Sequence, residues 1–109
     1  GLVLARLKIH SITRIAISYL TFDDIKLNLI DTNSMTGITN SLNVLKNVNL
    51  LILLTEENKG SIKVSLRTGV SQTDVGKIAK SFGGGGHTKA SGFSINGHLV
   101  QSNLAVKIV

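Results

Sequence analysis

The sequence predicts an α/β domain in which a mixed β-sheet of about four to five strands is flanked by helices. Three segments lead to this fold class. Residues 48–54 (VNLLILL) are almost wholly apolar, which is typical of a central strand covered on both faces. Residues 61–67 (SIKVSLR) alternate apolar and polar side chains, as a strand with one solvated face does. Residues 73–82 repeat apolar side chains at the spacing of an amphipathic helix.

The first half of the chain predicts one strand and two helices before the central strand. Residues 1–11 indicate the end of a helix or a lead-in, and residues 13–20 (TRIAISYL) a β-branched strand. A helix is predicted at 22–30, with Thr21 and Asp24 in the S/T-x-x-D capping pattern. Both acids of its first turn, at 23 and 24, are therefore interpreted as structural. Residues 31–40 predict a loop, and the 3.6-residue period predicts a helix at 37–46.

The second half predicts a hairpin, a capped helix and a short strand. A polar turn at 56–60 joins the strands at 48–54 and 61–67. The capping pattern recurs at Ser71 and Asp74 before the helix at 73–82, and Gly83 is well placed to end that helix. A strand at 92–95 and a turn at 96–97 follow. The last segment, 99–109, favours a helix over a final strand.

Composition limits the class of protein. The 109 residues are 42% hydrophobic and contain no cysteine, which indicates one domain with a real core and no disulfide scaffold. No apolar run reaches membrane-spanning length, and no signal-peptide pattern is present. We therefore expect a cytoplasmic protein that does not enter the membrane. Because the chain begins at Gly1 rather than Met, we expect a domain taken from a longer protein.

The net charge of +6 is concentrated in one part of the chain. Between positions 59 and 89 there are six basic residues and a single acidic residue, Asp74. A local positive field of this kind favours phosphates or nucleic acids, although a solvated basic surface is the alternative. With one Tyr and three Phe in the chain, base stacking along an extended strand is poorly supplied.

Four consecutive glycines at 83–86 lead into His87 and are the strongest functional signal. Glycine runs expose bare N–H groups that can bind an anion, and a histidine adds a donor that can become cationic. A flexible linker is the alternative, but predicted elements flank the run closely. The run follows a helix rather than a strand, and Lys89 follows Thr88, so it is not a P-loop.

Ser65 and Arg67 form a second candidate site. They lie two residues apart on a predicted strand, so both side chains project from one face. Arginine offers a planar fork for a phosphate or a base edge, and serine can donate to an oxygen. Lys63 shares this face and is interpreted as solvent-exposed, and taken alone the face could be an ordinary solvated one. His10 and His98 have no partners at metal-ligand spacing, so no metal ligands are predicted in this chain.

Together these motifs resemble a known family. Ser65-Leu66-Arg67 is followed by Asp74-Val75-x-x-Ile78-Ala79 and by Phe82-Gly83-Gly84-Gly85-Gly86-His87-x-x-Ala90-Ser91-Gly92-Phe93. This order resembles the C-terminal DHH-associated domain of the DHH phosphoesterases, whose hallmark is a GGGH loop. Within that superfamily the ending is most similar to the bacterial oligoribonucleases (nanoRNases) that also hydrolyse adenosine 3′,5′-bisphosphate. The strong similarity covers residues 63–93.

The resemblance implies a division of labour between two domains. An N-terminal domain with an Asp-His-His triplet would hold two manganese ions, and no such triplet occurs here. This chain would be the substrate-binding domain, with the N–H groups of Gly84, Gly85 and Gly86 around a phosphate. His87 would contact the substrate phosphate and assist the metal domain. Ser65 and Arg67 would hold another phosphate or a base of a short RNA.

Several alternatives remain from sequence alone. Alanyl-tRNA synthetases have a related C-terminal domain that binds RNA without catalysis, but there the histidine is typically replaced. Cyclic-dinucleotide phosphodiesterases and exopolyphosphatases belong to the same superfamily. The apolar lead-in also allows a dimerisation domain, and we expect that a homodimer could form through surface that the neighbouring domain would cover.

Overall fold

The computed structural model describes residues 2–27, 44–58, 60–103 and 105–109. The predicted loop at 31–40 and most of the predicted helix at 37–46 lie outside these residues. The helices and strands in chain order are α1 (Leu2–Ala5), β1 (Lys8–Ile9), β2 (Ile15–Leu20), α2 (Phe22–Lys26), α4 (Val44–Asn47), β3 (Leu50–Asn58), β4 (Ser61–Arg67), α5 (Val75–Ser81), β5 (Gly85–Gly86), β6 (Ala90–Asn96), β7 (Leu99–Gln101) and β8 (Val106–Ile108).

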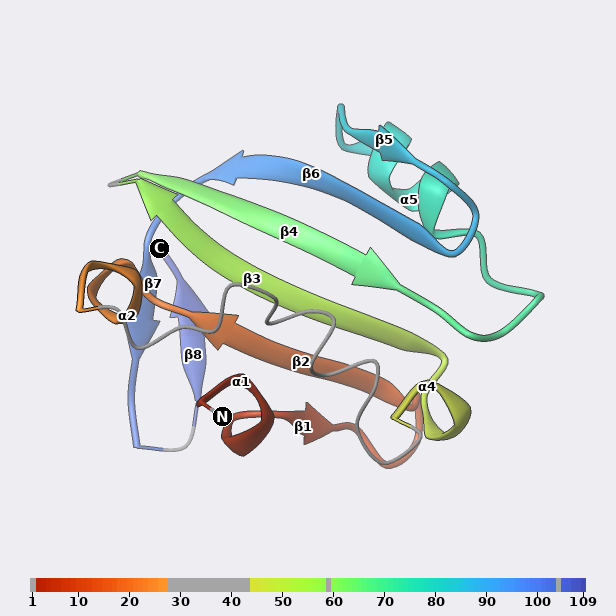
Figure 1. The fold of residues 1–109 in the computed structure, drawn as a ribbon, viewed down its shortest axis with the longest axis horizontal. Coiled ribbons are helices and arrows are strands. Elements are labelled where there is room, and N and C mark those ends of the chain that lie inside the picture. The colour runs from red at the N-terminus through yellow and green to blue at the C-terminus, as the bar shows by residue number, and fades with distance from the viewer. Residues whose placement is uncertain (1, 28–43, 59, 104) are drawn as a thin grey trace.

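A twisted mixed sheet dominates the molecule (Figure 1). Its six strands have the order β1-β2-β3-β4-β6-β5, and β2 and β3 are parallel whereas the other neighbours are antiparallel. A separate two-stranded sheet is formed by β7 and β8. The α/β class and the mixed sheet are therefore confirmed, and the main sheet has more strands than the sequence predicts.

The sheet has two differently covered faces. On the face that we call the front, Val3 of α1 packs over β2 and β3 in a buried apolar cluster. On the opposite, back face, α5 and the β7–β8 hairpin cover a second cluster that includes Ile62, Leu66 and Val75. Successive residues of β3, such as Leu53 and Leu54, are buried, so the apolar run correctly predicts a strand covered on both sides.

Helix α2 is shorter than predicted but begins as expected. The Thr21 hydroxyl accepts the N–H of Asp24, and the Asp24 carboxylate accepts the N–H of Thr21, which completes a capping box. The helix ends at Lys26, before the predicted end near residue 30. Asp24 is also bound by the guanidinium of Arg6 through both oxygens. The structural interpretation of this acid is thus confirmed, with an ion pair added to the cap.

The predicted turn at 56–60 begins too early. β3 continues to Asn58, and the turn to β4 is made at Gly60, whose φ of 93° is left-handed. Glu56 is buried within β3, because its carboxylate accepts the N–H groups of Phe22 at 2.7 Å and Leu99 at 3.0 Å. These charge-assisted hydrogen bonds let a carboxylate occupy a strand position that polarity alone would assign to a turn. The hairpin itself is confirmed.

The helix favoured at 99–109 is wrong: this segment forms the β7–β8 hairpin. The two backbone bonds between His98 and Val109, both 2.9 Å, close its open end, and the N–H of Ser102 donates to Ala105 at its turn. Leu99 is buried against the back-face cluster. The segment is short enough for apolar residues to fit either period, and packing on the sheet decides for strands.

The start of α5 also differs from its prediction. Asp74 itself is the N-cap, and its carboxylate accepts the N–H of Lys77 at 3.1 Å. The pair of Ser71 and Asp74 does not form the predicted capping box, and the helix begins at Val75. Strand β6 is longer than the predicted strand at 92–95.

Candidate phosphate-binding site

The first half of the glycine run ends helix α5. The N–H of Gly83 donates to the carbonyl of Lys80 at 3.1 Å, and the N–H of Gly84 donates to that of Ala79 at 2.9 Å. With Gly83 at a left-handed φ of 85°, this is the Schellman pattern of helix termination. The predicted helix stop is confirmed. It also means that the Gly84 N–H is already bonded, which narrows the expected phosphate contacts to Gly85 and Gly86.

The second half of the run is an edge strand rather than a flexible linker. In β5, Gly85 lies opposite Gly92 and Gly86 lies opposite Ser91 of β6. A Cβ on Gly86 would come within 2.6 Å of the Ala90 carbonyl oxygen, and the φ of Gly86 is 140°. Bare backbone is therefore required at Gly86 by both sterics and torsion.

The hairpin geometry leaves one N–H of the run at the sheet edge. The N–H of His87 donates to the Ala90 carbonyl at 2.7 Å, which makes this a hydrogen-bonded pair. Because such pairs alternate in an antiparallel ladder, the next pair, Gly86 with Ser91, is of the other kind. By this alternation the N–H of Gly86 is directed away from β6, toward the open edge of the sheet.

The β5–β6 hairpin is fixed to the start of α5. The N–H of Val75 donates to the Thr88 carbonyl at 2.9 Å, and the Ser91 hydroxyl donates to the Val75 carbonyl at 2.6 Å. A Cβ on Gly76 would come within 2.9 Å of the His87 carbonyl oxygen. Gly76 therefore permits the close approach, a role that its isolated position in a helical pattern could have signalled. The backbone around His87 is held in place before any ligand arrives.

Strand register brings the predicted site residues together. Ser65 of β4 lies opposite Gly92 of β6, and Arg67 lies opposite Ala90. His87 is hydrogen-bonded to that same Ala90 across the hairpin. Opposed residues of neighbouring strands project to the same face. The side chains of Ser65, Arg67 and His87 therefore share the front face, with only glycine and alanine between them.

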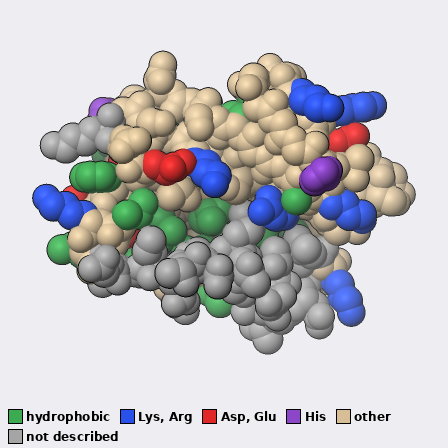
Figure 2. Space-filling view, turned by 45° about the horizontal axis from the view of Figure 1, so that its top comes forward, with side chains coloured by type: hydrophobic (Ala, Val, Ile, Leu, Met, Phe, Trp, Pro, Cys, Tyr) green, Lys and Arg blue, Asp and Glu red, His purple; other side chains and the backbone are tan. Residues whose placement is uncertain are grey.

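The three side chains differ in how firmly they are held. Arg67 is half-buried, and its Nη1 donates to the carbonyl of Leu66 at 2.8 Å and to that of Ser91 at 3.5 Å. Ser65 is also half-buried, whereas His87 is exposed. Among the described residues no carboxylate forms an ion pair with Arg67. Its charge is thus available to an anion on this face. Figure 2 shows basic and histidine side chains close together on part of the surface, with few acidic side chains among them.

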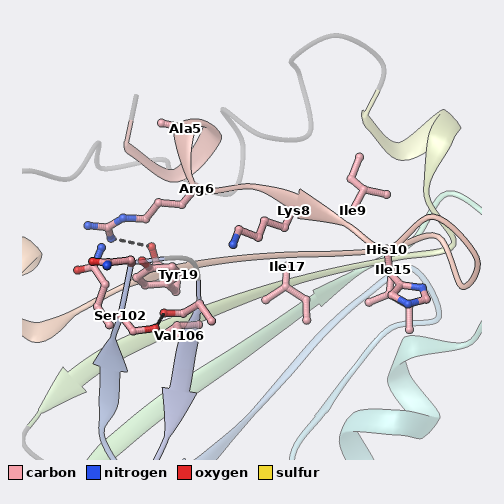
Figure 3. A pocket seen from close by; sticks show the side chains of 13 residues that line it. Ala5, Arg6, Lys8, Ile9, His10, Ile15, Ile17, Tyr19, Ser102 and Val106 are labelled. Atoms are coloured by element: carbon pink, nitrogen blue, oxygen red, sulfur yellow. Dashed lines mark hydrogen bonds between the residues drawn. The ribbon is translucent and has the colours of Figure 1, made fainter.

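The structure has a separate hollow that does not coincide with this site (Figure 3). It has a volume of about 610 Å³ and lies between β1, β2 and the β7–β8 hairpin. Its floor includes Ile17 and Tyr19, which by register project to the back face. Arg6 at its rim is paired with Asp24 and lies 4.5 Å from the Tyr19 ring centroid. Lys8 and His10 also line this hollow, but the Arg6 charge is balanced by Asp24 and no glycine backbone is exposed there among the described residues, so the front-face site fits a phosphate better.

No metal centre is formed by the described residues: 2–27, 44–58, 60–103 and 105–109 contain no group of three or more His, Cys, Asp or Glu side chains that could hold an ion. In the same residues no helix is long and apolar enough to cross a membrane. The sequence resemblance assigns the two manganese ions to an N-terminal domain, and the described residues of this chain offer no such set of ligands. The chemistry that the front-face site can supply is phosphate binding by fixed N–H, guanidinium, hydroxyl and imidazole donors.

The mixed sheet flanked by helices, with a glycine hairpin at one edge, defines an α/β domain. The chain belongs to the DHHA1 domain family, whose model matches residues 13–107.

Relatives of known structure share the fold. An exopolyphosphatase-related protein from Bacteroides fragilis is 31% identical and superposes with a TM-score of 0.66 over 83% of this chain. A pGpG-specific phosphodiesterase from Vibrio cholerae superposes with a TM-score of 0.59 over 86% of the chain at 18% identity, which supports the fold alone. The chain spans 26% and 31% of these two proteins.

One curated relative matches in sequence. The oligoribonuclease NrnB of Bacillus subtilis is 52% identical over 42 residues, which is 38% of this chain and 10% of the relative. The relatives named here are therefore much longer than this chain, and their names describe phosphoesterases or proteins related to them. This agrees with the family resemblance that the sequence motifs indicate.

Proposed function

We propose that this chain is the substrate-binding domain of a DHH-family phosphoesterase that hydrolyses short oligoribonucleotides, adenosine 3′,5′-bisphosphate or both. The observation that carries the proposal is the strand register. It places Ser65, Arg67 and His87 on one face, beside a backbone N–H that the ladder leaves outward at Gly86. The similarity to an oligoribonuclease favours short RNA among the phosphate-bearing substrates.

Each group has a separate task in this proposal. Arg67 binds a terminal phosphate through its planar fork, and its half-buried position limits the freedom lost on binding. The Gly86 N–H and the His87 imidazole donate to oxygens of the same phosphate, and Gly85 keeps the adjacent part of the edge strand free of a side chain. Ser65, two residues before Arg67, donates to a neighbouring oxygen of the substrate.

The reaction itself requires a second domain. We propose that an N-terminal DHH domain of the same protein holds two manganese ions and closes over this face. The metal ions would supply the attacking oxygen and charge neutralisation at phosphorus, whereas this chain would bind and orient the phosphate. We further propose that the protein acts in the cytoplasm.

Binding by the purified 109-residue chain tests the site. We expect weak binding of adenosine 5′-monophosphate and of the 5′-phosphorylated diadenylate in isothermal titration, without metal. Arg67→Ala should weaken both about 10- to 100-fold, as expected for a lost charge-assisted fork. Lys107→Gln, on β8, is the control with the same change in charge, and it should leave both affinities unchanged.

Two outcomes would contradict the proposal. Equal losses in the Arg67 and Lys107 variants would mean that only net charge matters. Tight binding of tRNA with no affinity for the small ligands would favour the alternative, an RNA-binding domain like that of alanyl-tRNA synthetases.

A further inference from the structure

The front face continues beyond the proposed site. Lys63 of β4 lies opposite Thr55 of β3 on one side and opposite Ser94 of β6 on the other. Lys63 precedes Ser65 by two residues, so both side chains project to the front face. Lys63 and Ser94 are both exposed, and Lys63 has no hydrogen bond or ion pair within the described residues. An ammonium and a hydroxyl thus stand side by side and face solvent.

Lys63, Ser65 and Arg67 follow one another along the front face of β4. A strand advances about 3.3 Å per residue, so Lys63 lies about 7 Å from Ser65 and about 13 Å from Arg67. Between the Lys63–Ser94 pair and the Arg67–Ala90 pair, the residue opposite Ser65 is Gly92, so no large side chain of β6 lies between Lys63 and Arg67. A chain with a phosphate at Arg67 can therefore pass along the face toward Lys63.

We propose that Lys63 and Ser94 form a second phosphate subsite for the next phosphate of a short oligoribonucleotide. This inference rests on the proposed function, because it requires the first phosphate to be bound at Arg67 and His87. The two subsites differ in chemistry. Arg67 offers a fixed planar fork, whereas Lys63 offers a point charge on a flexible stem, which tolerates different positions of an internal phosphate. Ser94 adds one hydroxyl donor.

Two ligands separate this subsite from the first. Adenosine 5′-monophosphate has one phosphate, and the 5′-phosphorylated diadenylate has two. Lys63→Gln should leave the affinity for the monophosphate unchanged and weaken the diadenylate about five- to tenfold at low salt. The slope of log K against log salt should fall by about 0.7 for the diadenylate alone, as expected when one phosphate contact is lost. Ser94→Ala should weaken only the diadenylate, by a smaller factor.

The outcomes distinguish the two proposals. If Lys63→Gln weakened the binding of both ligands equally, or of neither, the second subsite would be overturned. The proposed function would still be tested separately, by the effect of Arg67→Ala on both affinities. A fall in the salt slope of the same size in Lys107→Gln would also overturn it. If the unsubstituted chain bound neither ligand, the proposed function would fail and this inference with it.

Discussion

Gly86 combines a steric and a torsional requirement at the point where the proposed phosphate would be bound. Its neighbour Gly85 has neither, since a Cβ there would meet nothing within 4 Å and its φ is not in the left-handed region. Two adjacent glycines of one run therefore have different reasons to be glycine. At Gly86 the reason is the hairpin backbone, and at Gly85 a side chain could be added without a clash.

Gly86→Ala is expected to destabilise the chain by about 1–3 kcal/mol, because alanine would be strained at this φ and its Cβ would collide with β6. Gly85→Ala is the matched control and should change the free energy of unfolding by less than about 0.5 kcal/mol. Urea unfolding followed by circular dichroism measures both. Equal stability of the two variants would contradict the described backbone at Gly86.

The motifs predict which residues form the site, but not which of their groups are free. The glycine run and the histidine after it identify positions 83–87 as candidate site residues, and Arg67 is identified by its charge and its place on a predicted strand. That Gly84 donates to Ala79 depends on where α5 ends, and a helix end is fixed only within a residue or two by sequence. That Arg67 reaches the carbonyl of Ser91 depends on pairing between strands distant in sequence, which local patterns do not specify.

At the scale of elements, the ion pair of Arg6 and Asp24 joins α2 to β2 and to the segment that follows α1. Asp24 is bound by Arg6, whose Nη1 also donates to the Tyr19 carbonyl at 3.1 Å, and it caps its own helix through Thr21. Burial raises the pKa of Asp24, but the hydrogen bonds from Arg6 and Thr21 outweigh burial and hold the pKa below its ordinary value. Asp24 is thus favoured in its charged form when the chain is folded.

The depressed pKa gives the stability a defined dependence on pH. Because the pKa is lower in the folded than in the unfolded state, the stabilisation is complete above the unfolded value, near 4, and is lost as pH falls through the folded value. Asp24→Asn should lower the free energy of unfolding by about 1–3 kcal/mol at pH 7, and by much less at pH 3. Asp23→Asn, at the exposed neighbour, should do neither. A loss in Asp24→Asn that is the same at both pH values would contradict this role.

The sequence predicts the elements in which apolar residues recur at a clear spacing, but not the elements whose structure depends on tertiary contacts. The apolar run of β3 and the alternation of β4 are local signals that the sheet preserves. Glu56 lies in a strand although its charge predicts a turn, because two N–H groups from distant elements donate to its carboxylate. Leu99 lies in a strand because its side chain packs in the back-face core. Neither partner lies nearby in sequence.

At the scale of the whole molecule, the two faces of the sheet are covered by different elements. The back face holds α5, the C-terminal hairpin and most of the second core cluster. The front face holds α1 over β2 and β3, and beyond them the polar rows of β4 and β6. The proposed binding groups are therefore separated by the sheet from the hollow beside β1 and β2.

This arrangement predicts binding without turnover. The purified chain supplied with Mn²⁺ should not hydrolyse the 5′-phosphorylated diadenylate, because its described residues form no metal centre. Release of adenosine 5′-monophosphate, followed by ion-exchange chromatography, is the measurement, and a two-domain DHH phosphoesterase is the positive control. Manganese-dependent release by the chain alone would contradict the division of labour between two domains.

The docking of the β5–β6 hairpin on α5 has a thermodynamic consequence for recognition. A run of glycines that was free in solution would lose a large conformational entropy when it closed on a ligand. Here the hydrogen bonds of Gly83, Gly84 and His87, together with the contact at Gly76, order that backbone when the domain folds. In the proposed function a substrate would therefore meet a loop that is already ordered, and more of its interaction energy would remain as affinity. Loosening of α5 would reverse this advantage without touching a single ligand contact.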